Sequence, residues 1–159
     1  MVSLGNIDCC RLGEHDLPAL LAFCRENEGF YSYIRKTPDL ASLRQALTVL
    51  PPNAVPEQKH FLGLWKTGEL AAILDLIVDW PREGVAYIGW FMVAKARQRA
   101  GLGRRLIGEL CEQLKDSGYH TVRLGCVKDN LTGLGFWQAC GFAPTGAAVD
   151  NILLFERYL

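Results

Sequence analysis

Two glycines and several basic side chains between residues 93 and 105 offer the clearest chemistry in this sequence. The stretch reads Val-Ala-Lys-Ala-Arg-Gln-Arg-Ala-Gly-Leu-Gly-Arg-Arg, with glycines Gly101 and Gly103. A glycine lets a ligand approach the backbone closely. The helical pattern that follows would direct unpaired N–H groups and the positive end of a helix dipole at the same point. The stretch therefore predicts a binding site for a phosphate or pyrophosphate group.

The distribution of charge agrees with an anion site in this stretch. The chain has 17 Lys and Arg against 17 Asp and Glu, so its net charge gives no general attraction to nucleic acid or membranes. Residues 84–108 nevertheless contain no Asp or Glu. The basic residues of this segment are Lys95, Arg97, Arg99, Arg104 and Arg105. We therefore expect a small anionic ligand here, and no nucleic-acid or membrane partner.

Three phosphate-binding motifs can be compared with this stretch. A dinucleotide-binding fingerprint requires a small residue where Leu106 stands, and an acidic residue about 20 positions further on that is missing here. A P-loop requires Lys and then Ser or Thr after its last glycine, but Arg104 and Arg105 follow Gly103. The remaining motif, Q/R-x-x-G-x-G/A, begins at Gln98 and resembles that of the GNAT superfamily of N-acetyltransferases. A glycine turn with a solvated basic rim is the structural alternative for this motif alone.

A second segment strengthens the resemblance. Residues 127–130, Val-Lys-Asp-Asn, are similar to a strand end of that family, and residues 136–142, Phe-Trp-Gln-Ala-Cys-Gly-Phe, are similar to its last helix and the Gly-Phe pair that follows. The separations in sequence from Val93 to Asn130, and from Asn130 to Gly141, also resemble those of the family. On these two spaced motifs the chain is identified as a member of the GNAT superfamily.

The elements that must position these motifs can be read from the periodicity of the apolar residues. Apolar runs predict strands at 7–12, 60–65, 70–78, 85–93, 121–127, 142–145 and 152–158. Helical spacing predicts one helix capped by Asp16 and others at 39–50, from Leu102 to a stop at Gly118, and at 130–140. The order β-α-α-β-β-β-α-β-α-β-β is similar to that of the family. We therefore expect an α/β (α+β) fold in one domain, 1–159, with a mixed, mostly antiparallel twisted sheet of about seven strands and helices on both faces.

The resemblance implies acetyl-CoA as cosubstrate and a set of residues that bind it. In this family the strand before the motif separates from the next parallel strand, and the pantetheine arm lies in the gap. The resemblance places the backbones of Phe91, Met92 and Val93 along that arm, with one N–H group polarising the thioester carbonyl. Asn130 would bond the arm from the neighbouring strand end, and Phe136 would line the channel. The pyrophosphate would be held by the motif residues Gln98, Arg99, Ala100, Gly101, Leu102, Gly103 and Arg104. Core packing is the structural alternative for Met92, Val93 and Phe136, and it can coexist with these roles.

The implied reaction is acetyl transfer to a primary amine of a small molecule or peptide, by direct attack of the amine within a ternary complex. An ammonium is not a nucleophile, so a base must take its proton. The chain departs from the family at Trp137, where many members have a tyrosine acid, and at Gly125, where others have a glutamate. A catalytically silent module that binds acyl-CoA is therefore the alternative function. A nucleotide-binding regulatory domain is disfavoured by the missing fingerprints.

Candidate catalytic groups lie on the strands predicted at 70–78 and 85–93. Asp75 and Asp79 alternate with apolar residues on one face, and Tyr87 lies on the next strand, where some relatives carry a catalytic glutamate. Burial would raise the pKa of such a carboxylate towards neutrality, which suits a base. We predict Asp75 and Tyr87 as the catalytic pair. The alternatives are aspartates that face water at a strand edge and a tyrosine that packs in or beside the core.

The acceptor amine is expected beside residues 28–35, which join the first two predicted helices. This segment is rich in aromatic residues, so Tyr31 and Tyr33 would hold an aliphatic or aromatic amine, and Glu28 would hold a cation. The structural alternative is a packed loop that covers the core.

The cysteines and histidines indicate no metal site or disulfide framework. The 6 cysteines show no CxxC spacing, and residues 1–10 lack a signal-peptide pattern, so buried thiols in a reducing, cytoplasmic setting are expected. His15, His60 and His120 are scattered along the chain, without ligand spacing to one another. No apolar run approaches the roughly 20 residues that span a bilayer. A homodimer is left open by the sequence.

Overall fold

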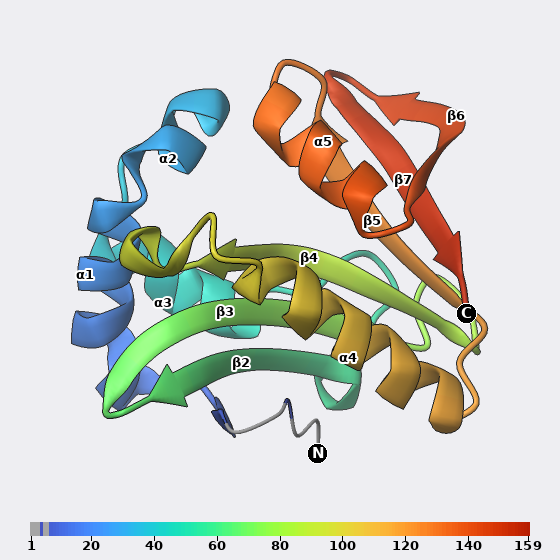
Figure 1. Cartoon of the computed structure of the whole chain (residues 1–159). Helices are drawn as coiled ribbons and strands as arrows, with labels where there is room; N and C mark the ends of the chain where they lie inside the picture. The colour runs from blue at the N-terminus through green and yellow to red at the C-terminus, as the bar shows by residue number, and fades with distance from the viewer. Residues whose placement is uncertain (1–3, 5–6) are drawn as a thin grey trace.

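The seven strands of the protein form one sheet within the described residues. The computed structural model describes residue 4 and residues 7–159. The strands follow the order β1-β2-β3-β4-β5-β7-β6 across the sheet (Figure 1). Their bounds are Asp8–Arg11 (β1), Lys59–Lys66 (β2), Glu69–Val78 (β3), Val85–Val93 (β4), Thr121–Val127 (β5), Ala143–Val149 (β6) and Ile152–Tyr158 (β7). Among these described strands only β4 and β5 are parallel neighbours, which confirms the mixed, mostly antiparallel sheet.

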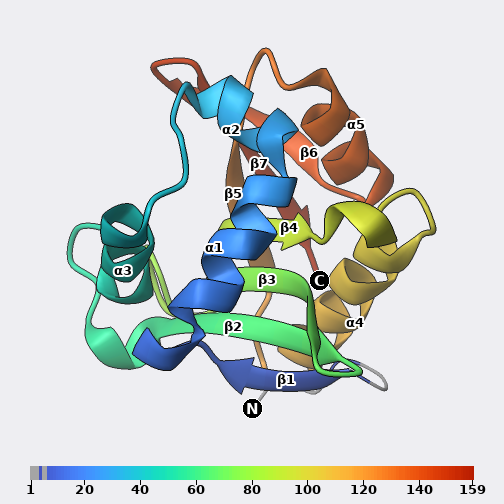
Figure 2. The ribbon, with the colours of Figure 1, turned by 90° about the vertical axis from the view of Figure 1, so that its left-hand side faces the viewer.

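Helices cover both faces of the sheet, as the sequence predicted (Figures 1 and 2). One face carries α1 (Leu17–Glu26), α2 (Glu28–Ile34) and α3 (Leu40–Thr48), and the other carries α4 (Leu102–Asp116) and α5 (Leu131–Ala139). Short 3-10 turns lie at Glu14–Asp16, Pro56–Gln58 and Lys95–Arg97. Side chains alternate along each strand, so the central strand β3 sends Leu74 and Leu76 to the α4 side and Ile73 to the α1 side. The sheet is therefore buried between two apolar layers at its centre.

The helix starts agree with the sequence in two cases and differ in one. Asp39 caps α3, since its side chain accepts from the Ser42 N–H at 2.9 Å, and Asn130 precedes α5. Asp16 precedes α1 as predicted, but its carboxylate accepts from the Gly13 N–H at 2.8 Å. The aspartate thus closes the 3-10 turn before α1 and makes no side-chain cap to α1 itself.

The helix α2 was not predicted. Its seven residues lie where the sequence indicated a connecting segment, so the observed order has three helices between β1 and β2. A helix of this length is marginal by itself. It is held by tertiary packing, because Phe30 stacks on Trp90 of β4 with ring centroids 5.8 Å apart. The sequence pattern of α2 contains no sign of that distant contact.

The feature that positions the site is the separation of β4 from β5. Within the described residues, the two strands pair over four positions, from Val85 opposite Thr121 to Ile88 opposite Leu124. Beyond Leu124, β5 continues to pair with β7, while β4 continues to pair with β3. The two parallel strands therefore open into a gap towards their C-terminal ends (Figure 1).

Candidate cofactor and acceptor site

The predicted anion-binding loop is built from left-handed backbone and a helix start. Arg99 and Gly101 have φ angles of 66° and 79°. A side chain at Gly101 would meet nothing within 4 Å, so this glycine is needed for its conformation and not for space. The first bond of α4 runs from the Arg105 N–H to the Gly101 carbonyl at 3.1 Å. The amides of residues 101–104 consequently have no acceptor within the helix and are available to a pyrophosphate.

Gly103 has a different role, because its α-carbon packs closely against two neighbouring elements. A Cβ at this position would lie 3.2 Å from the Phe136 ring of α5 and 3.2 Å from Val93 of β4. The glycine therefore lets the start of α4 approach the wall of the gap. This contact explains the second glycine of the motif by packing, whereas the sequence explained it by ligand approach alone.

Gln98 supports the loop through two hydrogen bonds that its side chain donates. Its Nε2 donates to the Val93 carbonyl at 2.9 Å and to Oδ1 of Asn27 at 2.8 Å. Asn27 is buried between α1 and α2, and its own Nδ2 donates to the Phe23 carbonyl at 2.8 Å. The pair ties the cofactor loop to the helices on the opposite face. Sequence reasoning missed Asn27, whose position 71 residues before Gln98 offers no local signal.

The edge of β4 presents alternating backbone groups to the gap. The Ala94 N–H donates to Ala71 of β3 at 2.8 Å. Because N–H groups alternate sides along a strand, the Met92 N–H also faces β3, while those of Phe91 and Val93 face the gap. Two of the three backbones that were predicted to bind pantetheine therefore face the gap. Met92 instead places its side chain among the buried residues below α1.

An aromatic group forms the α5 wall of the gap. Phe136 stacks on Phe91 with ring centroids 6.0 Å apart, and it contacts Trp137 edge-on at 4.9 Å. Trp137 is buried and also packs on Phe142 at 5.3 Å, so the residue that replaces the family tyrosine belongs to the core. Asn130 lies at the β5 side, where its Oδ1 accepts from Gly133 and caps α5.

The Asp75 carboxylate lies beside a bulge in β4, on the face of the sheet that α1 covers. Asp75 pairs with Trp90 and the next residue of β3 pairs with Ile88, so Gly89 is an additional residue in β4. Gly89 is exposed, and a Cβ there would lie 3.0 Å from Oδ2 of Asp75. The Asp75 side chain is 15% exposed, and it lies where β4 begins to separate from β5. Burial raises the pKa of Asp75, and Lys59, whose Nζ lies 2.8 Å from Oδ2, partly offsets that rise.

Asp79 has a structural role at the turn after β3. Its Oδ1 accepts from the Gly84 N–H at 2.8 Å, and its Oδ2 accepts from the Tyr119 hydroxyl at 3.2 Å. Asp79 therefore neither joins Asp75 at the bulge nor simply faces water, because both of its oxygens are bonded within the protein. These bonds leave Asp75 as the carboxylate of β3 that faces the bulge.

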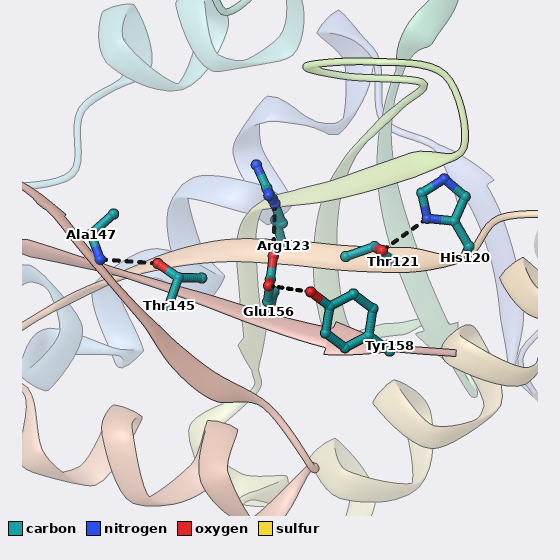
Figure 3. Close-up of polar contacts among 7 residues, drawn as sticks. All are labelled: His120, Thr121, Arg123, Thr145, Ala147, Glu156 and Tyr158. Carbon is teal, nitrogen blue, oxygen red and sulfur yellow. Dashed lines mark hydrogen bonds and ion pairs between the residues drawn. The ribbon is translucent and has the colours of Figure 1, made fainter.

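Tyr87 lies on the same face as Asp75 and reaches the start of the gap. Its hydroxyl lies 3.2 Å from the position that a Cβ of Gly125 would occupy, and Gly125 is the first residue of β5 beyond the paired segment. Burial raises the pKa of the Tyr87 phenol, so this group is protonated at neutral pH. Beside it, Arg123 donates to Glu156 at 3.0 Å, and Glu156 accepts from Tyr158 at 2.8 Å (Figure 3).

The predicted acceptor residues of α2 do not lie together. Tyr31 is buried against Trp90, with ring centroids 6.4 Å apart, whereas Tyr33 is 37% exposed and Glu28 is exposed. Phe30 of α2 stacks on Trp90 of β4, and sequence reasoning did not single out this aromatic contact. Within the described residues, the indole N–H of Trp90 is buried without a hydrogen-bond partner.

The cysteines and other potential metal ligands form no further site among the described residues. The six cysteines are free thiols, and four of them are buried. Among the described residues, no three His, Cys, Asp or Glu side chains are grouped so that they could hold a metal ion. No helix in the described part of the chain has the length and apolar character to cross a membrane.

A glycine-containing helix start at the end of two separating parallel strands, with a carboxylate on the other face of the sheet, is the arrangement that the sequence predicted for an acyltransferase that uses coenzyme A. Comparison with known proteins agrees with this class. The profile of the acetyltransferase (GNAT) family matches residues 19–142. The chain belongs to this family, and the predicted class of acetyl-CoA-dependent N-acetyltransferase is confirmed at that level.

Similar proteins share the fold at low sequence identity. The uncharacterized N-acetyltransferase YvbK of Bacillus subtilis (strain 168) is 27% identical over 94 residues, and the match spans 59% of this chain and 58% of that protein. An acetyltransferase from Thermus thermophilus superposes with a TM-score of 0.80 at 19% identity, covering 98% of this chain and 99% of the other. The PaiA N-acetyltransferase from Thermoplasma acidophilum, solved in complex with coenzyme A, gives a TM-score of 0.70 at 19% identity, with 97% and 99% covered.

Proposed function

We propose that residues 1–159 act as one catalytic domain that acetylates a primary amine of a small molecule or peptide. The observation that carries this proposal is the position of Asp75. Its Oδ2 borders the exposed backbone of Gly89, where β4 separates from β5. A carboxylate at this point can take a proton from an amine that approaches from the α2 face, while the cofactor approaches from the loop before α4.

The residues of the gap fit coenzyme A. Acetyl-CoA supplies the thioester whose acetyl group is transferred. The free amides at the start of α4 would hold its pyrophosphate, and the inward-facing groups of Phe91 and Val93 would pair with the pantetheine amides. The Phe91 N–H lies next to the bulge, so we assign it as the donor that polarises the thioester carbonyl. Phe136 would form the channel wall.

The two predicted catalytic residues receive different roles. Asp75 accepts the proton from the amine, because an ionised carboxylate can accept and its raised pKa brings it closer to neutral pH. Tyr87 cannot accept at neutral pH, because burial raises the pKa of a group that is already a weak acid. Its hydroxyl beside Gly125 can donate to the departing sulfur. Tyr87→Phe is expected to slow turnover without weakening acetyl-CoA binding, which steady-state rates and calorimetry would measure.

The first experiment is calorimetric titration with acetyl-CoA, free CoA and NAD, followed by thiol release with small primary amines and with peptides that have free N-termini. Saturable binding of both CoA species but not NAD, together with amine-dependent release of CoA, supports the proposal. Binding without release by any amine would favour the catalytically silent module instead. Absence of CoA binding would refute the site assignment.

A further inference from the structure

A buried lysine accompanies the proposed base. Lys59 is only 4% exposed, and its Nζ donates to both carboxylate oxygens of Asp75, at 2.9 and 2.8 Å. The lysine begins β2 opposite Ile77, so its side chain extends along the sheet to reach Asp75 in the middle of β3. The same Nζ lies 5.6 Å from the ring centroid of Phe61. A buried ammonium ion is costly unless it is paired, and this one is paired with the carboxylate beside the bulge.

We propose that Lys59 is a positioning residue for acetyl transfer, which orients the Asp75 carboxylate towards the opening at Gly89 and holds it in the ionised form. This inference rests on the function proposed above. Two oxygens of a carboxylate offer about four acceptor positions in total. Lys59 occupies one acceptor position on each oxygen, so Oδ2 keeps a free acceptor position on the side of Gly89.

The surroundings of Asp75 make its ionisation depend on Lys59. Among the described residues, Lys59 supplies the one charge that acts on this carboxylate. The facing residues Phe61 of β2 and Trp90 of β4 are uncharged. In the helical layer that packs on this face, the buried titratable groups are Tyr31 and Cys24, which are hydrogen-bonded to each other. Burial favours the neutral acid, which cannot accept a proton, and the adjacent ammonium opposes that effect.

The proposed proton transfer balances without any further reactant. The acceptor ammonium gives one proton to Asp75, and the freed nitrogen lone pair forms the C–N bond. The C–S bond breaks with its electron pair on sulfur, and the thiolate takes a proton from the Tyr87 hydroxyl or from water. The nitrogen loses one of its two remaining protons to become the amide, Asp75 releases the proton that it accepted, and Tyr87 recovers its own from solvent if it has donated. Lys59 keeps its three protons throughout and touches neither substrate.

A structural ion pair would also be destabilised by removing Lys59, so stability does not test the proposal. The test is the ionisation of Asp75 in the full-length protein with Lys59→Gln, which keeps a hydrogen-bond donor, and Lys59→Met, which does not. The Asp75 carboxyl carbon is titrated by NMR, with Asp75→Asn to assign the signal. Loss of an opposite charge at this distance should raise the pKa of Asp75 by about 1–3 units in both variants.

The same shift should appear in catalysis. The pH profile of kcat/KM is measured with the small amine or peptide that gives the fastest thiol release. The acid limb of this profile should move to higher pH by the same amount as the pKa of Asp75. In the Asp75→Asn background, Lys59→Met should change the rate by less than about twofold, because coupled residues are not additive. Arg44→Gln breaks the exposed pair with Glu14 and serves as the control, with an unshifted acid limb.

Three outcomes separate the proposal from the function on which it rests. An unchanged Asp75 pKa in both lysine variants overturns the role of Lys59, whether or not the wild type is active. A wild type that binds acetyl-CoA and acetylates amines, but is insensitive to Asp75→Asn, overturns the assignment of the base and the role of Lys59 with it. If the single lysine variants do not fold, the rate of the uncharged double variant Lys59→Met/Asp75→Asn is compared with that of Asp75→Asn. A rate below that of Asp75→Asn by more than about tenfold would show an independent role for Lys59 and refute the coupling.

Discussion

The two glycines inside α4 allow the packing at the gap to be tested against an internal control. Gly103 and Gly108 both lie in the helix, so replacing either with alanine should gain about 0.5–1 kcal/mol from helix propensity. A Cβ at Gly108 would meet nothing within 4 Å, whereas one at Gly103 would lie 3.2 Å from Phe136 and from Val93. Carbon atoms prefer about 3.5–4.0 Å, so Gly103→Ala must move the Phe136 ring or the helix start by a few tenths of an ångström.

The magnitudes follow from this difference. Overpacking of a fixed core costs about 1–3 kcal/mol, so Gly103→Ala should be less stable than Gly108→Ala by about that amount. For a chain of this length each kcal/mol corresponds to about 2–4 °C in Tm. Phe136 also forms the proposed channel wall, so displacing it should weaken acetyl-CoA binding by about tenfold, or 1.4 kcal/mol. Gly108→Ala should leave the Kd unchanged.

Thermal unfolding and calorimetric titration of the two variants measure both quantities. Equal Tm values would show that the approach of α4 to β4 and α5 is looser than the structure indicates. A lower Tm for Gly103→Ala with an unchanged Kd would show that Phe136 packs against the gap without contacting the cofactor. Only a combined loss of stability and affinity supports a Phe136 wall that both packs on Gly103 and contacts acetyl-CoA.

Three further predictions concern the Asn27–Gln98 hydrogen bond, the close contact at Gly125 and the cysteine thiols. Asn27→Leu removes one of the two acceptors of the Gln98 Nε2 group and leaves it the Val93 carbonyl, so it should cost about 0.5–1.5 kcal/mol in unfolding free energy, measured by urea denaturation. Gly125→Ala places a Cβ 2.7 Å from Ile152 and should cost about 1–3 kcal/mol, and Ile152→Ala in the same chain should restore much of the Tm lost by Gly125→Ala. In thiol labelling at pH 8, the exposed Cys10 should react first. The four buried thiols should react only on unfolding, since burial shields them and raises their pKa, which lowers the thiolate fraction in the folded state.

The sequence predicted those parts of the fold whose signals are local. The strands β4, β5 and β7 have the predicted bounds, because each is an apolar run that ends at a clear turn. The helix α2 was missed, because seven residues carry too little periodicity and its stability comes from Phe30 packing on Trp90. Local pattern thus determines the strands, while distant contacts determine this short helix.

The same distinction applies to the site. The anion-binding loop was predictable, since its glycines, basic residues and helix start are adjacent in the chain. Lys59 and Asn27 were not, because each acts on a partner from another element, and a buried lysine cannot be told from a surface one by residue type. Tyr31 and Tyr33 were grouped because they are close in sequence. Residues two positions apart on a helix project about 200° from each other, so only Tyr31 faces the sheet.

The two departures from the family pattern have packing explanations, and these bear on whether the chain is catalytic. Trp137 replaces a tyrosine acid but is held among Phe136, Phe91 and Phe142, so the position has become part of the core. At Gly125, where other members have a glutamate, a Cβ would lie 2.7 Å from Ile152 of β7. The Tyr87 hydroxyl lies 3.2 Å from the same Cβ position, at the start of the gap. Both family positions thus lack an acid, while Tyr87 places a phenol beside Gly125 and Asp75 places a carboxylate at the bulge. That arrangement favours an active enzyme over a silent binding module, because a module that only binds acyl-CoA would have no use for an ion-paired aspartate at the opening of the gap.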